Sequence, residues 1–292
     1  MSFMYDPDSI ISLLGTRLEP APMSAAERQG AEERAMQARN LFAQNPNLEN
    51  TIWYGRRLAY LFQYTHAIDI FTGGIARFPQ AYQLYRHRGH RYITTRQFSR
   101  ALADLEQAAA LAEGQPIVNE PDAVPNAQQQ PRSNGHFNIW YHLGLAYYLT
   151  QAFDKAQQAY ERCMDYVDND DSLTATLDWL YMTYRRLGNG AAAEQLLDQI
   201  RPVMDIVEND SYHRRLLMYK GVLQPEELLA VSADADDSDL TLATQGYGLG
   251  NWYLTAGDPE RAYAIFRRVL QTKNWAAFGY IASELELSKY QP

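Results

Sequence analysis

Small and large residues recur along the chain at a fixed spacing, and this pattern predicts its helices. A glycine is followed three residues later by a large residue, twelve residues later by an alanine and sixteen residues later by another large residue. Four stretches keep this spacing: Gly55-Leu58-Ala67-Phe71, Gly89-Tyr92-Ala101-Leu105, Gly144-Tyr147-Ala156-Tyr160 and Gly250-Tyr253-Ala262-Phe266. A weaker copy consists of Tyr184, Ala193 and Leu197, with Tyr181 in the place of the glycine.

The spacing is that of two antiparallel helices joined by a short turn. The glycine and the large residue three positions later lie on one face of a helix. The alanine and the large residue four positions after it form the apolar stripe of the next helix. Turn residues stand between such helices at 187–190 and 256–259, and Pro46 and Pro79 end helices 33 residues apart. The sequence therefore predicts a stack of helical hairpins.

The period of 34 residues resembles that of the tetratricopeptide repeat (TPR). The best matches are residues 140–164 and 247–270, and the resemblance extends over roughly residues 48–270. It implies an all-α fold, a right-handed α-solenoid of helix-turn-helix repeats with N- and C-terminal capping helices.

We predict an extended N-terminal arm over residues 1–23 and a single solenoid over residues 24–292. A capping box at Ser24 and Glu27 is expected to open a helix that ends near Asn45. The further elements expected are repeats near 48–81, 82–115, 137–170, 174–207 and 243–276, a degenerate repeat at 210–240, a proline-rich loop insertion at 112–136 and a capping helix at 275–287.

The order of elements in the C-terminal half also resembles the NlpI family of bacterial TPR lipoproteins. The shared features are a helix around Trp179-Leu180-Tyr181, a truncated pair of helices at 212–221 and 225–229, an acidic linker and a strong last repeat. That family is periplasmic and dimeric, and it acts as an adaptor for proteases and cell-wall hydrolases. The chain lacks the lipobox cysteine of that family, so the resemblance implies architecture rather than anchoring.

Composition excludes several classes of protein. Of the 292 residues, 46% are hydrophobic and 12% aromatic, which excludes disorder over the whole chain. The single cysteine excludes an internal disulfide framework. No run of about 18 apolar residues occurs, so we expect no membrane-spanning helix. The N-terminus does not follow the signal-peptide pattern, which predicts a cytoplasmic protein as written, or a periplasmic one if the chain is a mature form without its signal peptide.

The net charge of −9 hides a strong asymmetry along the chain. Residues 50–103 carry eight arginines and one acidic residue, a net +7, whereas residues 104–292 carry a net −13. Such an asymmetry bears on the choice of partner rather than on the fold. The basic block favours a partner with acidic groups, and the acidic remainder makes nucleic acid an unfavourable partner.

In the family that the chain resembles, the first helix of each repeat lines a concave groove. The corresponding places here are aromatic and cationic, which are the residue types enriched at binding hot spots. The candidate peptide-binding residues are Trp53, Arg56, Tyr60, Arg86, His87, His90, Tyr141, His142 and Arg185, and other groove places hold Ile52, Tyr148, Trp179, Met182 and Arg186. Guanidinium groups bind carboxylates bidentately, so an acidic segment fits this groove. The alternative is that these arginines are solvated or paired with acids, and that the aromatic residues belong to the core.

No combination of residues predicts catalysis, a metal site or a cofactor. Cys163 stands at a repeat place where a buried, inert thiol is expected. His87 and His90 have a spacing compatible with zinc, but no further ligand stands nearby and their neighbours are arginines. The glycines at 246, 248 and 250 are expected to serve helix packing rather than phosphate binding, and the acidic run at 234–239 fails the calcium-loop pattern.

The leading hypothesis is a non-enzymatic scaffold or adaptor that binds an acidic peptide or protein segment. Alternatives are nucleic-acid binding through residues 50–103 and, least favoured, a hydrolase or metalloenzyme. The 112–136 loop is expected either to fold into the groove or to run along the outer edge. The apolar stretch Ile10–Leu14 is expected to pack on an end of the stack, its own or that of a second copy in a homodimer.

Overall fold

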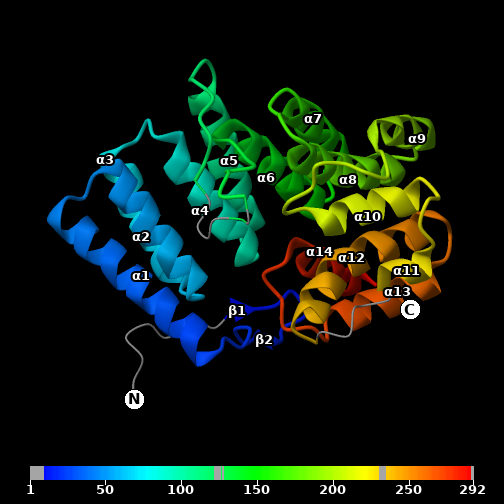
Figure 1. Ribbon diagram of the computed structural model, residues 1–292, viewed down its shortest axis with the longest axis horizontal. Coiled ribbons are helices and arrows are strands. Elements are labelled where there is room, and N and C mark those ends of the chain that lie inside the picture. The colour runs from blue at the N-terminus through cyan, green and yellow to red at the C-terminus, as the bar shows by residue number, and fades with distance from the viewer. Residues whose placement is uncertain (1–9, 122–125, 127, 230–234, 291–292) are drawn as a thin grey trace. The chain divides into compact units, whose positions relative to one another are not determined.

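The computed structural model describes residues 10–121, 126, 128–229 and 235–290. The chain divides into two compact units, unit 1 (Met1–Ile117) and unit 2 (Val118–Pro292), and each is described by itself. Figure 1 labels the elements of both units.

Unit 1 begins with a small antiparallel hairpin of strands β1 (Ile10–Ile11) and β2 (Arg17–Leu18). The hairpin lies within the segment that we predicted to be an extended arm, and Ile10, Ser12 and Leu18 are its buried residues. The helices that follow are α1 (Ala25–Gln44), α2 (Leu48–Tyr60), α3 (Tyr64–Arg77), α4 (Tyr82–Thr94) and α5 (Phe98–Ala112).

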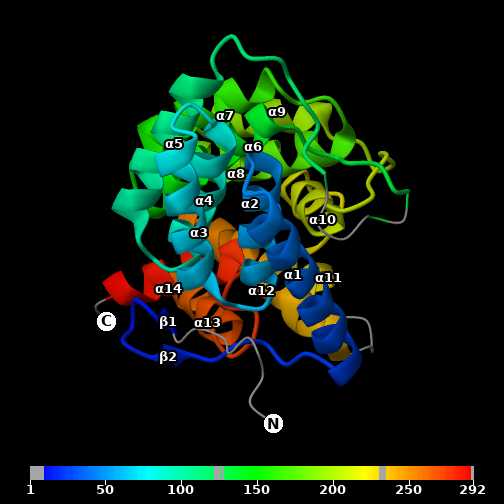
Figure 2. The ribbon, with the colours of Figure 1, turned by 90° about the vertical axis from the view of Figure 1, so that its left-hand side faces the viewer.

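Helix α1 closes one end of the unit 1 stack. It starts at the predicted capping box, in which the Ser24 hydroxyl accepts the Glu27 backbone N–H and the Glu27 carboxylate accepts that of Ser24. Its buried face carries only alanines, at 31, 35 and 38, which lets it pack closely on α2. Figure 2 shows α1 and α2 side by side. The opposite face of α1 is exposed, as expected for the end of a helical stack; most of its residues are polar or small, and Met36 and Leu41 are also exposed there.

Unit 2 contains α6 (Gly135–Leu149), α7 (Phe153–Met164), α8 (Asp170–Arg186), α9 (Gly190–Leu196) with a short 3-10 turn (Leu197–Gln199), α10 (Asp210–Tyr219), α11 (Pro225–Leu229), α12 (Ala235–Thr255), α13 (Pro259–Val269) and α14 (Phe278–Lys289). Consecutive helices pack as hairpins: α6 on α7, α8 on α9, α10 on α11 and α12 on α13. The described residues thus form fourteen α-helices in TPR-like pairs, which confirms the all-α prediction. None of the helices described is both long and apolar enough to cross a membrane.

The glycines of the repeat mark where the helices of a hairpin touch. At each of them an added Cβ would lie 2.4–2.8 Å from the side chain sixteen residues later, closer than side-chain atoms can approach. The four contacts are Gly55 with Phe71, Gly89 with Leu105, Gly144 with Tyr160 and Gly250 with Phe266. Each large partner is almost completely buried. The sequence spacing therefore reports a real contact between the two helices of each hairpin.

The turns within the hairpins use a left-handed residue at an equivalent place. Glycine takes it at 188 and 257, with φ of +74° and +88°. In three other hairpins a residue with a side chain adopts the same conformation: Phe62, Arg96 and Gln151. A residue with a Cβ is strained there, so the tight turn is favoured by the packing of the two helices rather than by local preference.

The repeat loses its regular form where tyrosine replaces the glycine. Tyr181 of α8 stacks on Tyr219 of α10, with ring centroids 4.1 Å apart and planes 7° apart. Its hairpin partner α9 has only seven residues, and α11 only five. The truncated pair that we predicted at 212–221 and 225–229 corresponds to α10 and α11.

Candidate functional site

The nine predicted groove residues fall into two groups, one in each unit. Unit 1 holds six of them: Trp53, Arg56 and Tyr60 on α2, and Arg86, His87 and His90 on α4. Unit 2 holds the other three: Tyr141 and His142 on α6, and Arg185 on α8. Each group is therefore considered on its own.

Helix α2 presents two guanidinium groups over one indole ring. The Cζ atoms of Arg56 and Arg57 lie 4.6 and 4.8 Å from the centroid of the Trp53 ring. Tyr60 follows one turn later and is 44% exposed. A guanidinium stacked on a ring keeps its N–H groups at its rim, where a carboxylate accepts them in pairs. The ring and the two cations thus make a combined apolar and cationic surface.

Helix α4 adds a further cation to the same region. The Cζ atom of Arg91 lies 5.5 Å from the centroid of the Tyr64 ring. Burial lowers the pKa of Arg91, and the positive charge of Arg56 on α2 lowers it further. We call Trp53, Arg56, Arg57, Tyr60 and Arg91 the arginine–aromatic surface.

The charges on this surface repel one another. Burial lowers the pKa of Arg57, and Arg34 of α1 and Arg56 lower it too. Arginine stays protonated at any physiological pH despite such shifts. An anion placed there would relieve the repulsion, which makes the surface electrostatically suited to carboxylates.

Two members of the surface were not among the predicted residues. Arg57 and Arg91 are 34 residues apart, so they occupy the same place in successive repeats. Their shared repeat position was the sequence signal that could have identified them. The groove places of the resembled family do not include this position.

Arg86 and His87 are mainly packing residues. They are 8% and 6% exposed, and the Arg86 Nη1 atom lies 2.8 Å from His87 Nδ1. The His87 ring stacks on Phe71 of α3, with centroids 5.6 Å apart and planes 17° apart. His90 is only partly buried. A direct role for these three residues in ligand contact stays a prediction.

Two other arginines of the basic block stabilise the hairpins. Arg88 makes two hydrogen bonds to the Asp104 carboxylate, at 2.7 and 2.8 Å, and so ties α4 to α5. Arg77 donates to the Pro46 carbonyl and to the Thr51 hydroxyl, joining α3 to the start of α2. The +7 of the block is therefore divided between internal contacts and the arginine–aromatic surface.

In unit 2 the predicted residues contact another part of the same unit. The ring of Phe278, the first residue of α14, lies 6.4 Å from that of Tyr141 and 5.6 Å from that of His142. Both α6 residues are buried. Arg185, on α8, is only partly buried. The last helix thus covers part of the face that we predicted to line a groove.

Polar side chains continue this contact towards the end of α14. The Arg186 guanidinium forms an ion pair with the Glu286 carboxylate of α14, and its Nε donates to the Asn251 amide oxygen at 2.6 Å. The Tyr148 hydroxyl donates to the same oxygen at 3.2 Å and accepts from the Tyr247 hydroxyl at 2.8 Å. These groups join α6, α8, α12 and α14 through hydrogen bonds.

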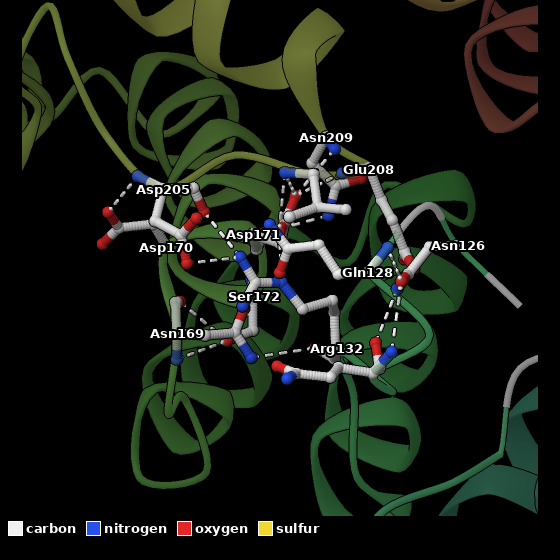
Figure 3. A network of polar contacts seen from close by, with 12 residues as sticks. Asn126, Gln128, Arg132, Asn169, Asp170, Asp171, Ser172, Asp205, Glu208 and Asn209 are labelled. Carbon is white, nitrogen blue, oxygen red and sulfur yellow. Dashed lines mark hydrogen bonds and ion pairs between the residues drawn. The ribbon is translucent and has the colours of Figure 1, made fainter.

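The described part of the 112–136 loop is anchored at the starts of α8 and α10 (Figure 3). Arg132 donates to the carboxylates of Asp171 and Asp205, at 2.9 and 2.7 Å. The Asp171 carboxylate also accepts the backbone N–H groups of Glu208 and Asn209, both at 2.8 Å. These contacts tie the described part of the loop to the start of α8 and to the segment before α10.

Unit 2 also buries one ion pair completely. Arg215 of α10 makes two hydrogen bonds to the Asp178 carboxylate of α8, and both side chains have no exposed surface. A third N–H of Arg215 donates to the Thr244 carbonyl of α12. The pair fixes three helices to one another.

Cys163 has the environment of an inert thiol, as predicted. It is fully buried, and its Sγ lies 3.6 Å from the Phe137 carbonyl oxygen and from the Thr176 hydroxyl. Burial raises its pKa to about 12. The thiolate needed for nucleophilic chemistry is therefore scarce at neutral pH.

A family model agrees with this architecture. Residues 137–166, which cover most of α6, the turn after it and all of α7, match the family model of the tetratricopeptide repeat. The chain is similar to YrrB, a TPR protein with an unusual peptide-binding site, with 12% identity over 86% of this chain and 99% of that one, and a TM-score of 0.44. It is also similar to a tetratricopeptide repeat protein from Parabacteroides merdae ATCC 43184, with 12% identity over 89% of this chain and 94% of that one, and a TM-score of 0.48. No curated protein sequence matches the chain. The chain is thus a helical-repeat protein with TPR-like hairpins.

Proposed function

We propose that the chain is a non-enzymatic interaction scaffold that binds an acidic segment of a partner protein on its arginine–aromatic surface. The observation that carries the proposal is the position of the Arg56 and Arg57 guanidinium groups over Trp53, with the exposed Tyr60 one turn after Arg56. Trp, Tyr and Arg are the residues that dominate binding free energy at protein interfaces. Helical-repeat folds are suited to this role because stacked helices present an extended surface.

The charge of unit 1 supports an acidic ligand. Carboxylates would accept hydrogen bonds from the guanidinium rims, and an aromatic side chain would pack on Trp53 or Tyr60. The basic block would also attract such a segment over a distance of about 8 Å at physiological salt. Polar contacts of this kind determine specificity and the rate of association.

Other parts of the proposal rest on the sequence resemblance. An adaptor of the NlpI type would work in the periplasm as a dimer. We propose this adaptor role for the chain, with a homodimer as one arrangement in which it would act.

The test is binding of a fluorescein-labelled peptide of four Glu-Glu-Phe triplets, measured by fluorescence anisotropy. The double substitution Arg56→Glu and Arg57→Glu should weaken binding on the order of tenfold or more, which corresponds to about 1.4 kcal/mol or more for the two lost contacts together. Arg268→Glu, an exposed residue of α13, is the matched control and should leave the affinity unchanged. A labelled peptide of four Lys-Lys-Phe triplets should not bind.

Equal affinity of the double variant and the control would contradict the proposal. A labelled 20-nucleotide single-stranded DNA serves as the competing ligand. If it binds more tightly than the acidic peptide, with a steep loss of affinity as salt rises, the nucleic-acid alternative would replace the scaffold proposal.

A further inference from the structure

Helix α14 has an unusual position for a helix at the end of a repeat array. Its residues from Gly279 to Glu286 are all buried. A helix that only closes a stack keeps one solvated face, as α1 does in unit 1. Besides α12 and α13, α14 contacts α6, and it is ion-paired to α8. Figure 1 shows α14 beside α12. It therefore lies against the first helices of three separate hairpins.

The start of α14 contacts α6 through an aromatic ring and approaches the backbone of α12 closely. Phe278 packs edge-on against His142, with the ring planes at 88°. At Gly279 an added Cβ would lie 2.2 Å from the Ala243 carbonyl oxygen of α12. Any side chain at that place would push the helix away from α12, because a backbone atom cannot move aside.

The end of α14 is held by charge. Glu286 is 6% exposed and pairs with Arg186, which is itself fixed by the Asn251 amide oxygen. A buried ion pair contributes more to the orientation and register of the two helices that it joins than to net stability. The carboxylate of α14 thus meets a preorganised guanidinium on α8.

The face beneath α14 carries several polar groups. Tyr141 and His142 of α6 lie against the Phe278 ring, and Arg186 of α8, held by the Asn251 amide oxygen, pairs with Glu286. Interfaces between parts that separate are more polar than cores, because both sides must tolerate water.

We propose that the face formed by α6, α8, α12 and α13 is a helix-binding site, and that α14 is its resident, autoinhibitory ligand. The partner is a helix of another protein that carries an aromatic residue directly before a small residue and a carboxylate seven residues after the small one. This is the pattern of Phe278, Gly279 and Glu286 in α14. The site lies wholly in unit 2, so the proposal does not depend on the arginine–aromatic surface.

Hydrogen exchange of the unmodified full chain is the first test. The amides of α14 should exchange through an opening that leaves α12 and α13 protected, because a resident ligand must detach without unfolding of the unit. If the α14 amides remain protected as long as those of α12 and α13, α14 is part of one cooperative core and the proposal is wrong.

A variant of the full chain provides the second test. Gly279→Val should release α14, and a labelled peptide of residues 276–290 should then bind the vacated face about tenfold or more tightly than it binds the unmodified chain. The same peptide with Gly279→Val should not bind. Equal binding of the two peptides, or of the two chains, would overturn the proposal.

A second variant keeps the test decisive if Gly279→Val unfolds. Glu286→Arg opposes Arg186 and should also increase binding of the native peptide, whereas Glu226→Arg on α11, where the side chain is exposed, should not. No difference between these two variants would count against the proposal. Dimers that form by exchange of α14, and only in the Glu286→Arg variant, would also count against the proposal. The face would then bind α14 of a second copy of this chain and not a helix of another protein.

Discussion

The two units are built from the same hairpin but use their first helices differently. In unit 1, Tyr60 of α2 is exposed, and Trp53 is partly buried beneath two arginines. In unit 2, Tyr141 of α6 and Arg186 of α8 lie against α14. One repeat position can thus lie at the surface of a unit or form an internal interface. The difference depends on whether a later segment of the same unit covers it.

The units also differ in where they place charge. The Arg88–Asp104 pair of unit 1 lies between neighbouring helices of one hairpin and keeps some exposure. The Asp178–Arg215 pair of unit 2 is completely buried and joins separate hairpins. Unit 2 therefore relies more on buried polar contacts, and it should be more sensitive to their removal.

The largest expected effect is the loss of the buried pair. Asp178→Asn leaves the Arg215 charge without its carboxylate in a dry site, which should lower the free energy of unfolding by about 3 to 5 kcal/mol. Urea denaturation measures this loss, and hydrogen exchange should show lost protection mainly in unit 2.

The matched control is Asp165→Asn in the exposed Arg162–Asp165 pair, whose side chains are about half exposed. Its effect should be at most about 1 kcal/mol, as for exposed ion pairs generally. A loss below about 1 kcal/mol for Asp178→Asn would show that unit 2 does not depend on its buried pair as argued.

A smaller effect is expected at the contacts within the hairpins. Gly144→Ala places a methyl group against the rigid ring of Tyr160, and Gly89→Ala places one against the side chain of Leu105. The ring cannot change shape, so Gly144→Ala should cost about 2 kcal/mol. Leu105 has other rotamers, and alanine favours a helix over glycine by about 1 kcal/mol, so Gly89→Ala should cost less.

Thermal unfolding of the two variants checks this difference between the two hairpins. Equal midpoints would mean that the Tyr160 and Leu105 contacts tolerate the added methyl group alike, and the argument from the rigid Tyr160 ring would be wrong.

The smallest effect concerns the turns. Gln151 has a φ of +60°, where Gly257 stands at the equivalent turn. Gln151→Gly should remove the strain of a side chain in the left-handed region and stabilise unit 2 by about 0.5 to 1 kcal/mol. The reverse change, Gly257→Ala, should destabilise by about 1 kcal/mol. Chemical denaturation of both variants tests the pair, and a loss of stability in Gln151→Gly would refute the idea that this turn is strained.

The repeat pattern was a good guide to local structure. It located the hairpins because a glycine and a large residue sixteen positions later must meet wherever two helices cross closely, as Gly144 and Tyr160 do. The Ser24 capping box predicted the start of α1, because its two hydrogen bonds involve only neighbouring residues. The burial of Cys163 followed from its repeat position.

The same pattern was a poor guide to the surroundings of the groove residues. His87 occupies a groove place but stacks on Phe71, because a helix side chain can turn towards either neighbouring helix. Arg57 and Arg91 were missed, although they share one repeat position. The partners of Arg132 lie 39 and 73 residues away, and no regular spacing connects them.

The residue pattern alone therefore specified the helices, their pairing into hairpins and the basic character of residues 50–103, because these depend on spacings of a few to 34 residues and on composition. Only the tertiary structure decided which repeat positions remain at the surface. Helix α14 lies against α6, and the contact between Phe278 and His142 joins residues that are 136 positions apart in the sequence. Such contacts follow from the path of the whole unit, and helical periodicity carries no information about that path.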